Sequence, residues 1–545
     1  MTGHGGELAL AALRPFGVDT LFTLSGGHIF PLYDAAVKDG DVRILDVRHE
    51  QTATFAAEGV AKLTRRPGVA VLTAGPGVTN GISAVTTAHF NGSPLIVLGG
   101  RAPQARWGAG SLQEFDHVPV LAPITKHAAT VTETEMMGRD VHDAVVTALT
   151  PHRGPVFLDL PLDVVFGEAE GLVPEVGGTG AVTPDAVEFD GDEVARAAAL
   201  IAGASRPAVI AGSDVYWGAA WDALRAFVET LRVPTFVNGL GRGCLPADHE
   251  LAFSRTRGLL KTEADVVVVI GTPLDFRLSF GSFGDAQVIH VLDSPDGHAE
   301  HVVPAAEPAG DLAGILTALA DYSGLGGLTD HEPWIARLRD AEDAAREADA
   351  PLLAAGGDGP IKPTRIYGEL RARLDRDAVV VCDGGDFVSY AGKYIDSYEP
   401  GCWMDPGPYG CLGTGMGYAI AARITHPDRQ VVVLLGDGAA GFSLMDVDTL
   451  VRHDLPVVMV MGNNGIWGLE KHPMQMLYGY DVAADLQPGC RYDQVVTALG
   501  GAGEVVERAD DIGPALDRAF AAGVPYLVNI LTDPADQYPR TSNLG

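Results

Sequence analysis

Cysteine, long apolar runs and positive charge are all scarce in this chain of 545 residues. Its five cysteines are scattered and form no CxxC pair, which argues against a disulfide framework or a zinc site and predicts a reducing cytoplasm. No uncharged apolar run reaches the roughly 18 residues of a membrane span, and the N-terminus lacks the pattern of a signal peptide. Lys and Arg number 38 against 71 Asp and Glu, and the net charge of −33 disfavours nucleic acid and anionic membranes as partners.

Short apolar runs that end at glycine or a polar residue recur along the chain and predict an α/β fold. Repeated strand–helix units build doubly wound parallel sheets, and three such units are expected, at 1–170, 190–325 and 360–545. The predicted strands are 20–24, 43–47, 69–73, 94–98, 207–211, 234–237, 266–270, 288–292, 379–382, 431–435, 456–461 and 525–531. The predicted helices are 51–63, 80–90, 332–348 and 410–423, residues 171–190 are expected to be a linker, and the tail from Asp533 is expected to be either a lid or a frayed end.

The stretch 431–468 carries the most specific pattern in the chain. Its two apolar runs end in Gly-Asp-Gly and in Asn-Asn, which the carboxyl ends of parallel strands would bring to one edge of a sheet, where ligands bind. Mg²⁺ prefers hard oxygen ligands and often shares them with a phosphate group. Asp437, Asn464 and the backbone carbonyl of Ile466 are therefore the predicted metal ligands.

This pattern resembles the diphosphate-binding motif of thiamine diphosphate (ThDP) enzymes. Segments in all three predicted domains are similar to acetolactate synthase-like proteins and 2-hydroxyacyl-CoA lyases. They are Leu-Ser-Gly-Gly-His at 24–28, Arg-His-Glu at 48–50, Thr-Ala-Gly-Pro-Gly at 73–77, Asp-Phe-Arg-Leu-Ser-Phe-Gly at 275–281 and Asp-Gly-Gly-Asp-Phe at 383–387. The resemblance implies the ThDP-binding fold of that family, with a pyrimidine-binding domain, a central Rossmann-like domain and a diphosphate-binding domain in this order.

The resemblance also implies a catalytic role for Glu50. ThDP reacts through a carbanion at its thiazolium C2, and a carboxylic acid on pyrimidine N1′ promotes the imino tautomer that removes the C2 proton. Such a residue has to lie in an apolar cleft, whereas the residue pattern alone fits a surface or helix-capping Glu equally well. The other implied cofactor contacts are Thr73, Pro76, Asn80, Asp386, Phe387, Gly410, Leu412, Gly438, Ala439, Gly468 and Leu469, with Leu412 bending the cofactor into its V shape.

Residues on the substrate side are less distinctive. Gln113 matches a Gln that faces the substrate in both branches of the family, and it is counted with Glu50 and His28 as a catalytic candidate. His28 could move a proton at neutral pH, or it could cap a helix. Trp467 and Glu470 follow the Asn-Asn motif and could line the pocket or simply pack a helix.

The central domain has strand ends at Gly212, Gly271 and Asp293 that are typical of a nucleotide-binding edge. The resemblance implies FAD, as in acetolactate synthases, or ADP, as in oxalyl-CoA decarboxylases, although many family members leave this domain empty. Arg277 would lie near that nucleotide or near the substrate channel.

The implied activity is that of a ThDP- and Mg²⁺-dependent carboligase. It would decarboxylate a 2-oxo acid such as pyruvate and ligate the resulting enamine to a second carbonyl compound. The segment Asn-Gly-Ile-Trp at 464–467 departs from acetolactate synthases, which have Gly-Met-Val after Asn-Asn, and looks more like the CoA-thioester branch. The alternative is therefore a 2-hydroxyacyl-CoA lyase that yields formyl-CoA and an aldehyde or ketone.

Two further expectations come from the resemblance. The family's active site lies between two chains, so a homodimer or homotetramer is expected, with Glu50 of one chain facing Asp437 and Asn464 of another. A non-catalytic regulatory paralogue is a third reading. The presence of Glu50, Asp437 and Asn464 disfavours it.

Overall fold

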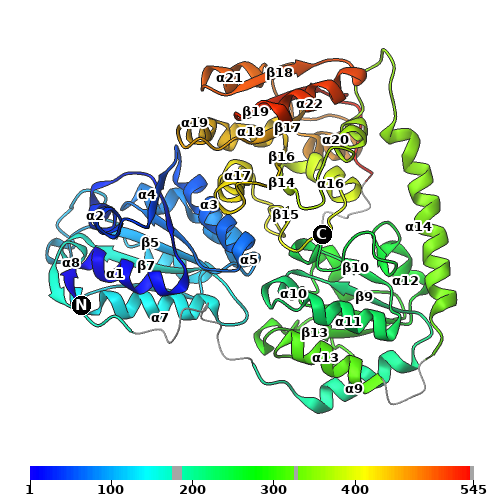
Figure 1. The fold of residues 1–545 in the computed structure, drawn as a ribbon, viewed down its shortest axis with the longest axis horizontal. Coiled ribbons are helices and arrows are strands. Elements are labelled where there is room, and N and C mark those ends of the chain that lie inside the picture. Colours follow the sequence, from blue (N-terminus) through cyan, green and yellow to red (C-terminus); the bar gives the residue numbers. More distant parts are fainter. Residues whose placement is uncertain (175–186, 324–328, 540–545) are drawn as a thin grey trace.

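The computed structural model describes residues 1–174, 187–323 and 329–539. It contains three α/β domains, each with a parallel β-sheet that has helices on both faces (Figure 1). The N-terminal sheet has the order β3-β2-β4-β5-β7-β6. Its strands are β2 (Thr20–Thr23), β3 (Arg43–Asp46), β4 (Gly68–Leu72), β5 (Leu95–Arg101), β6 (His127–Thr130) and β7 (Val156–Pro161). The helices beside them are α1 (Gly5–Leu13), α2 (Phe30–Asp39), α3 (Glu50–Thr64), α4 (Pro76–Asn80), α5 (Ile82–Phe90) and α7 (Met137–Leu149).

The central sheet has the order β11-β10-β9-β12-β13. Its strands are β9 (Pro207–Ala211), β10 (Thr235–Val237), β11 (Ala252–Phe253), β12 (Val266–Ile270) and β13 (Gln287–Val291). The helices of this domain are α9 (Gly191–Gly203), α10 (Ser213–Trp217), α11 (Trp221–Leu231), α12 (Leu260–Glu263) and α13 (Leu312–Ser323). The predicted linker at 171–190 lies largely outside the described residues.

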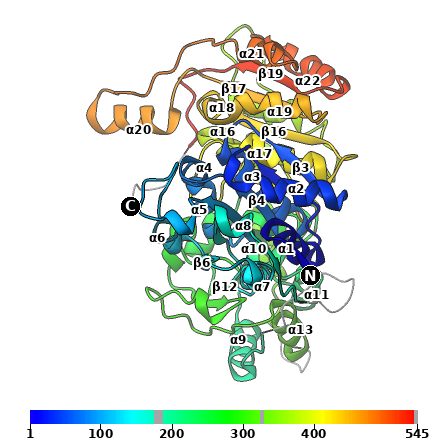
Figure 2. The ribbon, with the colours of Figure 1, turned by 90° about the vertical axis from the view of Figure 1, so that its left-hand side faces the viewer.

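The C-terminal sheet repeats the strand order of the N-terminal one, as β15-β14-β16-β17-β19-β18. Its strands are β14 (Val379–Asp383), β15 (Trp403–Met404), β16 (Val431–Gly436), β17 (Val458–Asn463), β18 (Ala502–Val506) and β19 (Tyr526–Leu531). Its helices are α15 (Pro363–Leu370), α16 (Gly385–Tyr394), α17 (Thr414–Thr425), α18 (Asp437–Ser443), α19 (Val447–Arg452), α20 (Gly468–Tyr478), α21 (Tyr492–Ala498) and α22 (Ile512–Ala521). In the side view, α20 projects away from the body of the domain (Figure 2).

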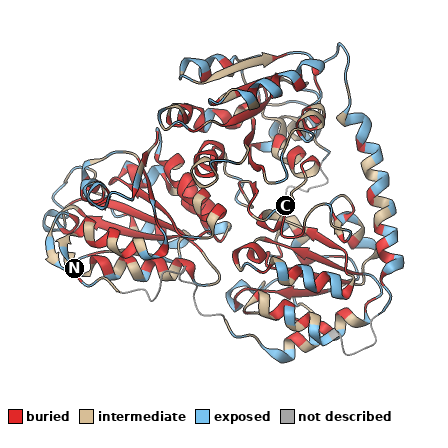
Figure 3. Ribbon diagram, in the orientation of Figure 1, coloured by how far each residue is buried: buried red, intermediate tan, exposed pale blue. Residues whose placement is uncertain are grey.

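The predicted fold class is confirmed, because each of the twelve predicted strands corresponds to a parallel strand with ends that agree within three residues. The strands are buried between the helices because their Val-, Ile- and Leu-rich sequences have no polar face to offer water (Figure 3). Five described strands of these sheets were not predicted, namely β6, β7, β11, β15 and β18. A short antiparallel pair, β1 (Thr2–His4) with β8 (Glu168–Glu170), ties the ends of the N-terminal domain together.

Two predicted helix boundaries are wrong. The helix expected over 80–90 is split into α4 and α5 at Gly81. The helix expected from Gly410 begins only at Thr414, because Gly410 (φ +68°) and Gly413 (φ +90°) have left-handed backbone that cannot continue a right-handed helix. The segment around Leu412 is therefore a loop before α17.

The N- and C-terminal domains share one hydrophobic core through helices α3 and α17. Gly59 of α3 faces Ala421, and a Cβ added at Gly59 would lie 2.6 Å from that methyl group. A Cβ on Gly417 of α17 would lie 2.5 Å from Phe55 Cβ, so glycine on each helix permits the close approach. This packing brings the first residues of the two helices together, and Gln51 Nε2 donates to the Leu412 carbonyl at 3.0 Å.

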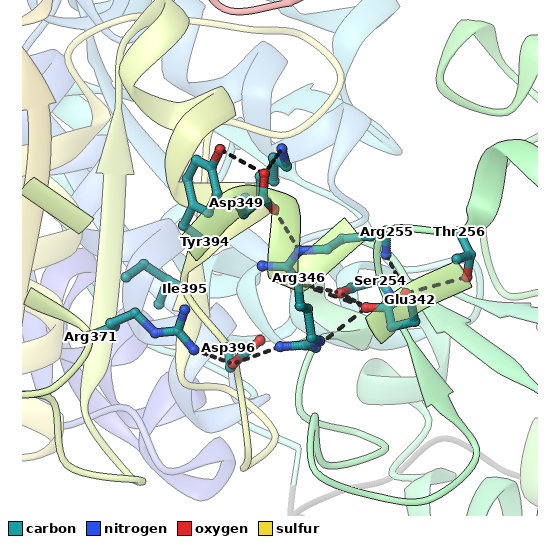
Figure 4. Close-up of polar contacts among 12 residues, drawn as sticks. Ser254, Arg255, Thr256, Glu342, Arg346, Asp349, Arg371, Tyr394, Ile395 and Asp396 are labelled. Atoms are coloured by element: carbon teal, nitrogen blue, oxygen red, sulfur yellow. Dashed lines mark hydrogen bonds and ion pairs between the residues drawn. The ribbon is translucent and has the colours of Figure 1, made fainter. Parts of the chain in front are cut away.

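A long helix, α14 (Glu332–Leu353), connects the central and C-terminal domains and extends five residues beyond its predicted end at 348. Its buried Glu342 accepts hydrogen bonds from the Ser254 hydroxyl (2.9 Å) and the Arg255 N–H (2.8 Å), which follow β11. Two turns on, Asp349 joins Arg255 of the central domain (3.0 Å) to Lys393 of α16 (2.7 Å) (Figure 4). These paired charges make α14 a strap across the two domains. Within the described residues, no helix is both long and apolar enough to cross a membrane.

Candidate active site

The predicted metal ligands lie together at the carboxyl edge of the C-terminal sheet. Strands β16 and β17 are neighbours with Gly436 opposite Gly462, so Asp437 and Asn464 emerge side by side. The Asp437 carboxylate accepts the Gly465 N–H at 2.8 Å, and the Asn464 side-chain oxygen accepts the Ile466 N–H at 3.1 Å. The two turns are thereby held in register, with hard oxygen atoms gathered at one point.

Burial raises the pKa of Asp437 to about 6, even though backbone N–H groups of the same turns act to lower it. The groups that lower it are weak, neutral donors, so the buried carboxylate lacks a strong positive partner. A divalent cation would supply that charge. The oxygen-only donor set of Asp437, Asn464 and Ile466 fits Mg²⁺ chemically.

A cavity of about 490 Å³ opens beside these ligands. It is lined by Asp386, Phe387, Gly410, Leu412, Asp437, Gly438, Ala439, Asn464, Ile466, Trp467, Gly468, Leu469 and Glu470, all of them residues singled out from the sequence. Asp386 and Phe387 lie in the first turn of α16, and Gly438 and Ala439 lie in the first turn of α18. The N-termini of both helices therefore face the cavity, an arrangement that favours an anionic diphosphate.

Sequence reasoning assigned no role to four cavity residues, namely Asn238 and Phe276 of the central domain, Asp405 after β15 of the C-terminal domain, and Asp536 of the tail. Asn238 comes directly after β10, the same strand-end signal that identified Asn464. Its side-chain nitrogen is buried without a hydrogen-bond partner. Asp536 accepts from Tyr390 at 2.7 Å, so the described part of the tail is held against the domain, while residues 540–545 lie outside the described chain.

The predicted pyrimidine-side residues form a second group, in the N-terminal domain. Glu50 is the first residue of α3 and is buried, with 6% of its surface exposed. Asn80, at the end of α4, donates to the Glu50 carboxylate at 3.0 Å. A Cβ added at Gly77 would lie 2.7 Å from the Thr73 methyl group and 3.7 Å from a Glu50 carboxylate oxygen. The four predicted pyrimidine-side residues therefore lie next to one another, namely Glu50, Thr73, Pro76 and Asn80.

The two substrate-side candidates of the N-terminal domain adjoin this group. His28 Nδ1 lies 3.4 Å from the Thr73 hydroxyl, and burial lowers the pKa of His28, so the imidazole is neutral at pH 7. Gln113 packs on Gly75, where an added Cβ would lie 3.0 Å from Gln113 Cβ. Gln113 has a left-handed backbone (φ +59°), an unusual conformation for this residue type that often marks a functional loop.

The two groups do not share one pocket in the single chain. None of Glu50, Thr73, Pro76 and Asn80 lines the 490 Å³ cavity, which is bounded by the central and C-terminal domains. Exposed apolar side chains adjoin both groups. They are Phe30, Leu112 and Phe115 in the N-terminal domain, and Phe442, Met445, Met476, Leu477 and Tyr478 in the C-terminal domain.

The switch point of the central sheet lies between β9 and β12, and a nucleotide bound by this domain would be expected to place its diphosphate there. The backbone donors there are already used, because the Gly212 N–H bonds the Ile270 carbonyl (2.8 Å) and the Asp214 N–H bonds the Gly271 carbonyl (3.0 Å). A Cβ on Gly212 would lie 2.3 Å from Thr272 Cβ. The two loops therefore touch, and the cavity beside them measures about 40 Å³, room for about one water molecule.

The charged groups at this switch point also disfavour the binding of a nucleotide. His152 of the N-terminal domain lies 3.5 Å from Asp214 and 3.3 Å from Asp293. The Asp214 carboxylate, together with Asp293, raises the pKa of His152 to about 9, and burial raises the pKa of Asp214 to about 7. An imidazolium already neutralises the acidic pair where a phosphate would have to bind. FAD and ADP do not fit this edge. Arg277, the other residue considered for a nucleotide, lines both this small cavity and the large one, and it is paired with Asp275 at 2.6 Å.

Comparison with known proteins bears on all three domains. The thiamine pyrophosphate enzyme family matches through its N-terminal TPP binding domain at residues 3–120, its central domain at 194–319 and its C-terminal TPP binding domain at 383–530. An acetolactate synthase large subunit, IlvG, of Mycobacterium tuberculosis is 53% identical over 548 residues, covering 100% of this chain and 98% of the relative. The 2-hydroxyacyl-CoA lyase 2 of Caenorhabditis elegans is 33% identical over 579 residues, covering 98% and 90%, and the human protein of that name is also 33% identical.

Proposed function

Because this chain belongs to the thiamine pyrophosphate enzymes, we propose that it is an acetolactate synthase-type carboligase that uses ThDP and Mg²⁺. In this proposal it decarboxylates a 2-oxo acid such as pyruvate and joins the remaining carbon unit to a second carbonyl compound. The observation that carries the proposal is the 53% identity to an acetolactate synthase along the whole chain, against 33% to 2-hydroxyacyl-CoA lyases.

The site chemistry supports this activity. When bound, ThDP supplies a nucleophilic carbon and stabilises the negative charge left by decarboxylation. Asp437, Asn464 and Ile466 would hold Mg²⁺ against the diphosphate, and the first turns of α16 and α18 would donate N–H groups to it. Leu412, in the loop before α17, would support the bent cofactor.

The N-terminal residues would manage protons. Glu50 would share a proton with the pyrimidine N1′ nitrogen, and its bond from Asn80 (3.0 Å) holds the carboxyl group in one orientation. The neutral His28 and the left-handed Gln113 would face the substrate, where His28 can accept a proton or a hydrogen bond.

We further propose that the active form is a dimer or a dimer-based tetramer. The cavity lacks the pyrimidine-side residues of its own chain, and the exposed apolar side chains beside both groups would be covered by a second copy. Five free cysteines support a reducing, cytoplasmic setting. No flavin or ADP enters this proposal, since neither fits the central switch point.

The lyase remains the second candidate because the segment 464–467 and the 33% identity both favour it to some degree. Product analysis of the purified protein with ThDP and Mg²⁺ separates the two. Acetolactate from pyruvate alone supports the carboligase. A 2-hydroxyacyl-CoA from formyl-CoA and an aldehyde, with pyruvate inert, would replace it with the lyase.

A further inference from the structure

His117 is a buried histidine that contacts the turn at Gly75, directly before Pro76, and it has no part in the function proposed above. His117 Nε2 lies 3.0 Å from the backbone N–H of Gly75, and His117 Nδ1 lies 3.0 Å from an Asp159 carboxylate oxygen. Both side chains are fully buried, with 0% exposed. Arg101 donates to the other Asp159 oxygen at 2.6 Å, and its guanidinium group lies 3.7 Å above the Trp107 ring. The Asp159 carboxylate is therefore held between His117 and Arg101.

These contacts determine where the imidazole carries its proton. The Gly75 N–H can only donate, so His117 Nε2 has to be the acceptor and therefore has no hydrogen. The ring proton then sits on Nδ1 and points to an Asp159 carboxylate oxygen, which accepts it. Asp159 thus selects the tautomer that Gly75 needs.

Gly75 lies beside the pyrimidine-side residues and has a restricted backbone conformation. Its backbone (φ +60°, ψ −112°) is one that side chains rarely adopt, and it precedes the first turn of α4. Pro76 begins α4 and Asn80 ends it, where Asn80 bonds the Glu50 carboxylate at 3.0 Å. Gln113 packs on the other side of Gly75. The His117 bond therefore holds the turn that leads into α4, the helix that carries Pro76 and Asn80.

We propose that His117 is a positioning residue for the ThDP reaction. Held in its Nδ1–H tautomer by Asp159, it fixes the Gly75 turn and, through α4, the orientation of Glu50. The inference rests on ThDP binding at this group. It does not depend on which substrate the enzyme uses.

The test compares three variants of the full chain, all assayed with saturating ThDP and Mg²⁺. His117→Phe keeps a ring between Phe115 and Phe157, its present aromatic neighbours, but cannot accept from Gly75. We expect turnover to fall by about 10- to 100-fold, the scale of a small misplacement of reacting groups, together with weaker ThDP binding measured by tryptophan fluorescence. His117→Gln offers an amide oxygen to Gly75 and should recover most of the loss.

Asp159→Asn tests the tautomer itself. Its amide can donate to His117 Nδ1, which moves the ring proton to Nε2 and sets it against the Gly75 N–H. We expect a loss comparable to that of His117→Phe, although the imidazole is retained. The matched control is His331→Phe, which removes another buried histidine, in the central domain, bonded only to the carbonyls of Leu231 and Ala204. It should lower the melting temperature without changing ThDP affinity or turnover.

Wild-type turnover in a folded His117→Phe or in Asp159→Asn would overturn the proposal, and so would a His117→Gln variant no better than His117→Phe. If His117→Phe fails to fold, Asp159→Asn and His117→Gln decide the question alone. ThDP binding by fluorescence needs no substrate, so a wild-type protein that forms no acetolactate would count against the proposed function and leave this test intact.

Discussion

The Asp446 carboxylate of the C-terminal domain accepts a hydrogen bond of 2.6 Å from the Thr52 hydroxyl of the N-terminal domain. The same carboxylate accepts the Arg48 N–H at 2.8 Å. Arg48 and Thr52 stand two residues before and after Glu50, at the start of α3. A residue nine positions beyond Asp437 on the same segment therefore holds the helix end that carries the predicted catalytic Glu.

Replacing Asp446 by Ala should lower both stability and turnover. The buried Thr52 hydroxyl would lose its acceptor, at a cost of about 1–3 kcal/mol, the Arg48 N–H would lose its partner as well, and the end of α3 would be free to shift. Thermal unfolding and steady-state kinetics measure the two effects. Asp428→Ala, which removes an exposed carboxylate between α17 and β16, is the control and should retain full turnover. An unchanged rate in Asp446→Ala would show that Glu50 is positioned without it.

Glu50→Gln should reduce turnover by about 100-fold or more, the upper part of the range for lost general acid–base catalysis. The amide has nearly the same shape but cannot exchange a proton with the cofactor ring, so ThDP binding should be largely kept. Acetolactate formation and ThDP affinity are measured on the same preparation. Glu168→Gln, at an exposed position of β8, is the matched control. A fully active Glu50→Gln would remove Glu50 from the mechanism.

Asp437→Asn should weaken Mg²⁺ binding and, with it, the Mg²⁺-dependent binding of ThDP. The substitution removes the buried negative charge that a divalent cation would neutralise, while the Gly465 N–H keeps an oxygen acceptor. Titrating Mg²⁺ at fixed ThDP, with tryptophan fluorescence as the signal, gives the change in affinity. Asp454→Asn is a suitable control because its left-handed backbone (φ +54°) tolerates Asn. Equal Mg²⁺ affinities for wild type and Asp437→Asn would contradict the metal site.

Glu342→Gln should destabilise the strap helix α14 by about 3–5 kcal/mol, the usual cost of breaking a buried charged network. Burial acts to raise the pKa of Glu342, but hydrogen bonds from Arg255 and Ser254 and the charge of Arg346 outweigh it, so the pKa lies below its ordinary value of 4.5. Its stabilisation is therefore present above that value and is lost as the pH falls through the lower, folded-state pKa.

The melting temperatures of wild type and Glu342→Gln should accordingly converge in acid and separate at neutral pH. Glu347→Gln, on an exposed face of the same helix, should melt like wild type throughout. A constant difference between wild type and Glu342→Gln across the acid range would show that Glu342 is protonated in the folded protein.

The purified protein should show no visible flavin absorption, and added FAD should not raise its melting temperature. The reason is steric and electrostatic, since the loops at Gly212 and Thr272 touch and Asp214 is already paired with His152. Absorption spectra and thermal shifts measure both expectations. Stoichiometric FAD in the protein as isolated would show that these loops separate.

The amino-acid sequence by itself determined most of the strands, the fold class and the predicted metal ligands. Strands such as β16 and β17 are continuous apolar runs, and the residues that follow parallel strands reach the same edge of the sheet. The sequence therefore predicts that Asp437 and Asn464 lie close together. The pyrimidine-side residues depended on the resemblance of short segments to a known family, since a lone Glu at a helix start carries no distinctive local signal.

The tertiary structure alone decided which distant groups meet. His117 and Gly75 are 42 residues apart, and Thr52 and Asp446 are 394 apart, and no local periodicity encodes such pairs. The loop before α17 was mistaken for helix because its left-handed glycines look, in sequence, like the small residues of a packed helix. The closed edge of the central domain was hidden for a related reason. Its strand ends have the residues of a nucleotide site. The space that the nucleotide would need is filled by the contact between two loops and by His152 of the N-terminal domain.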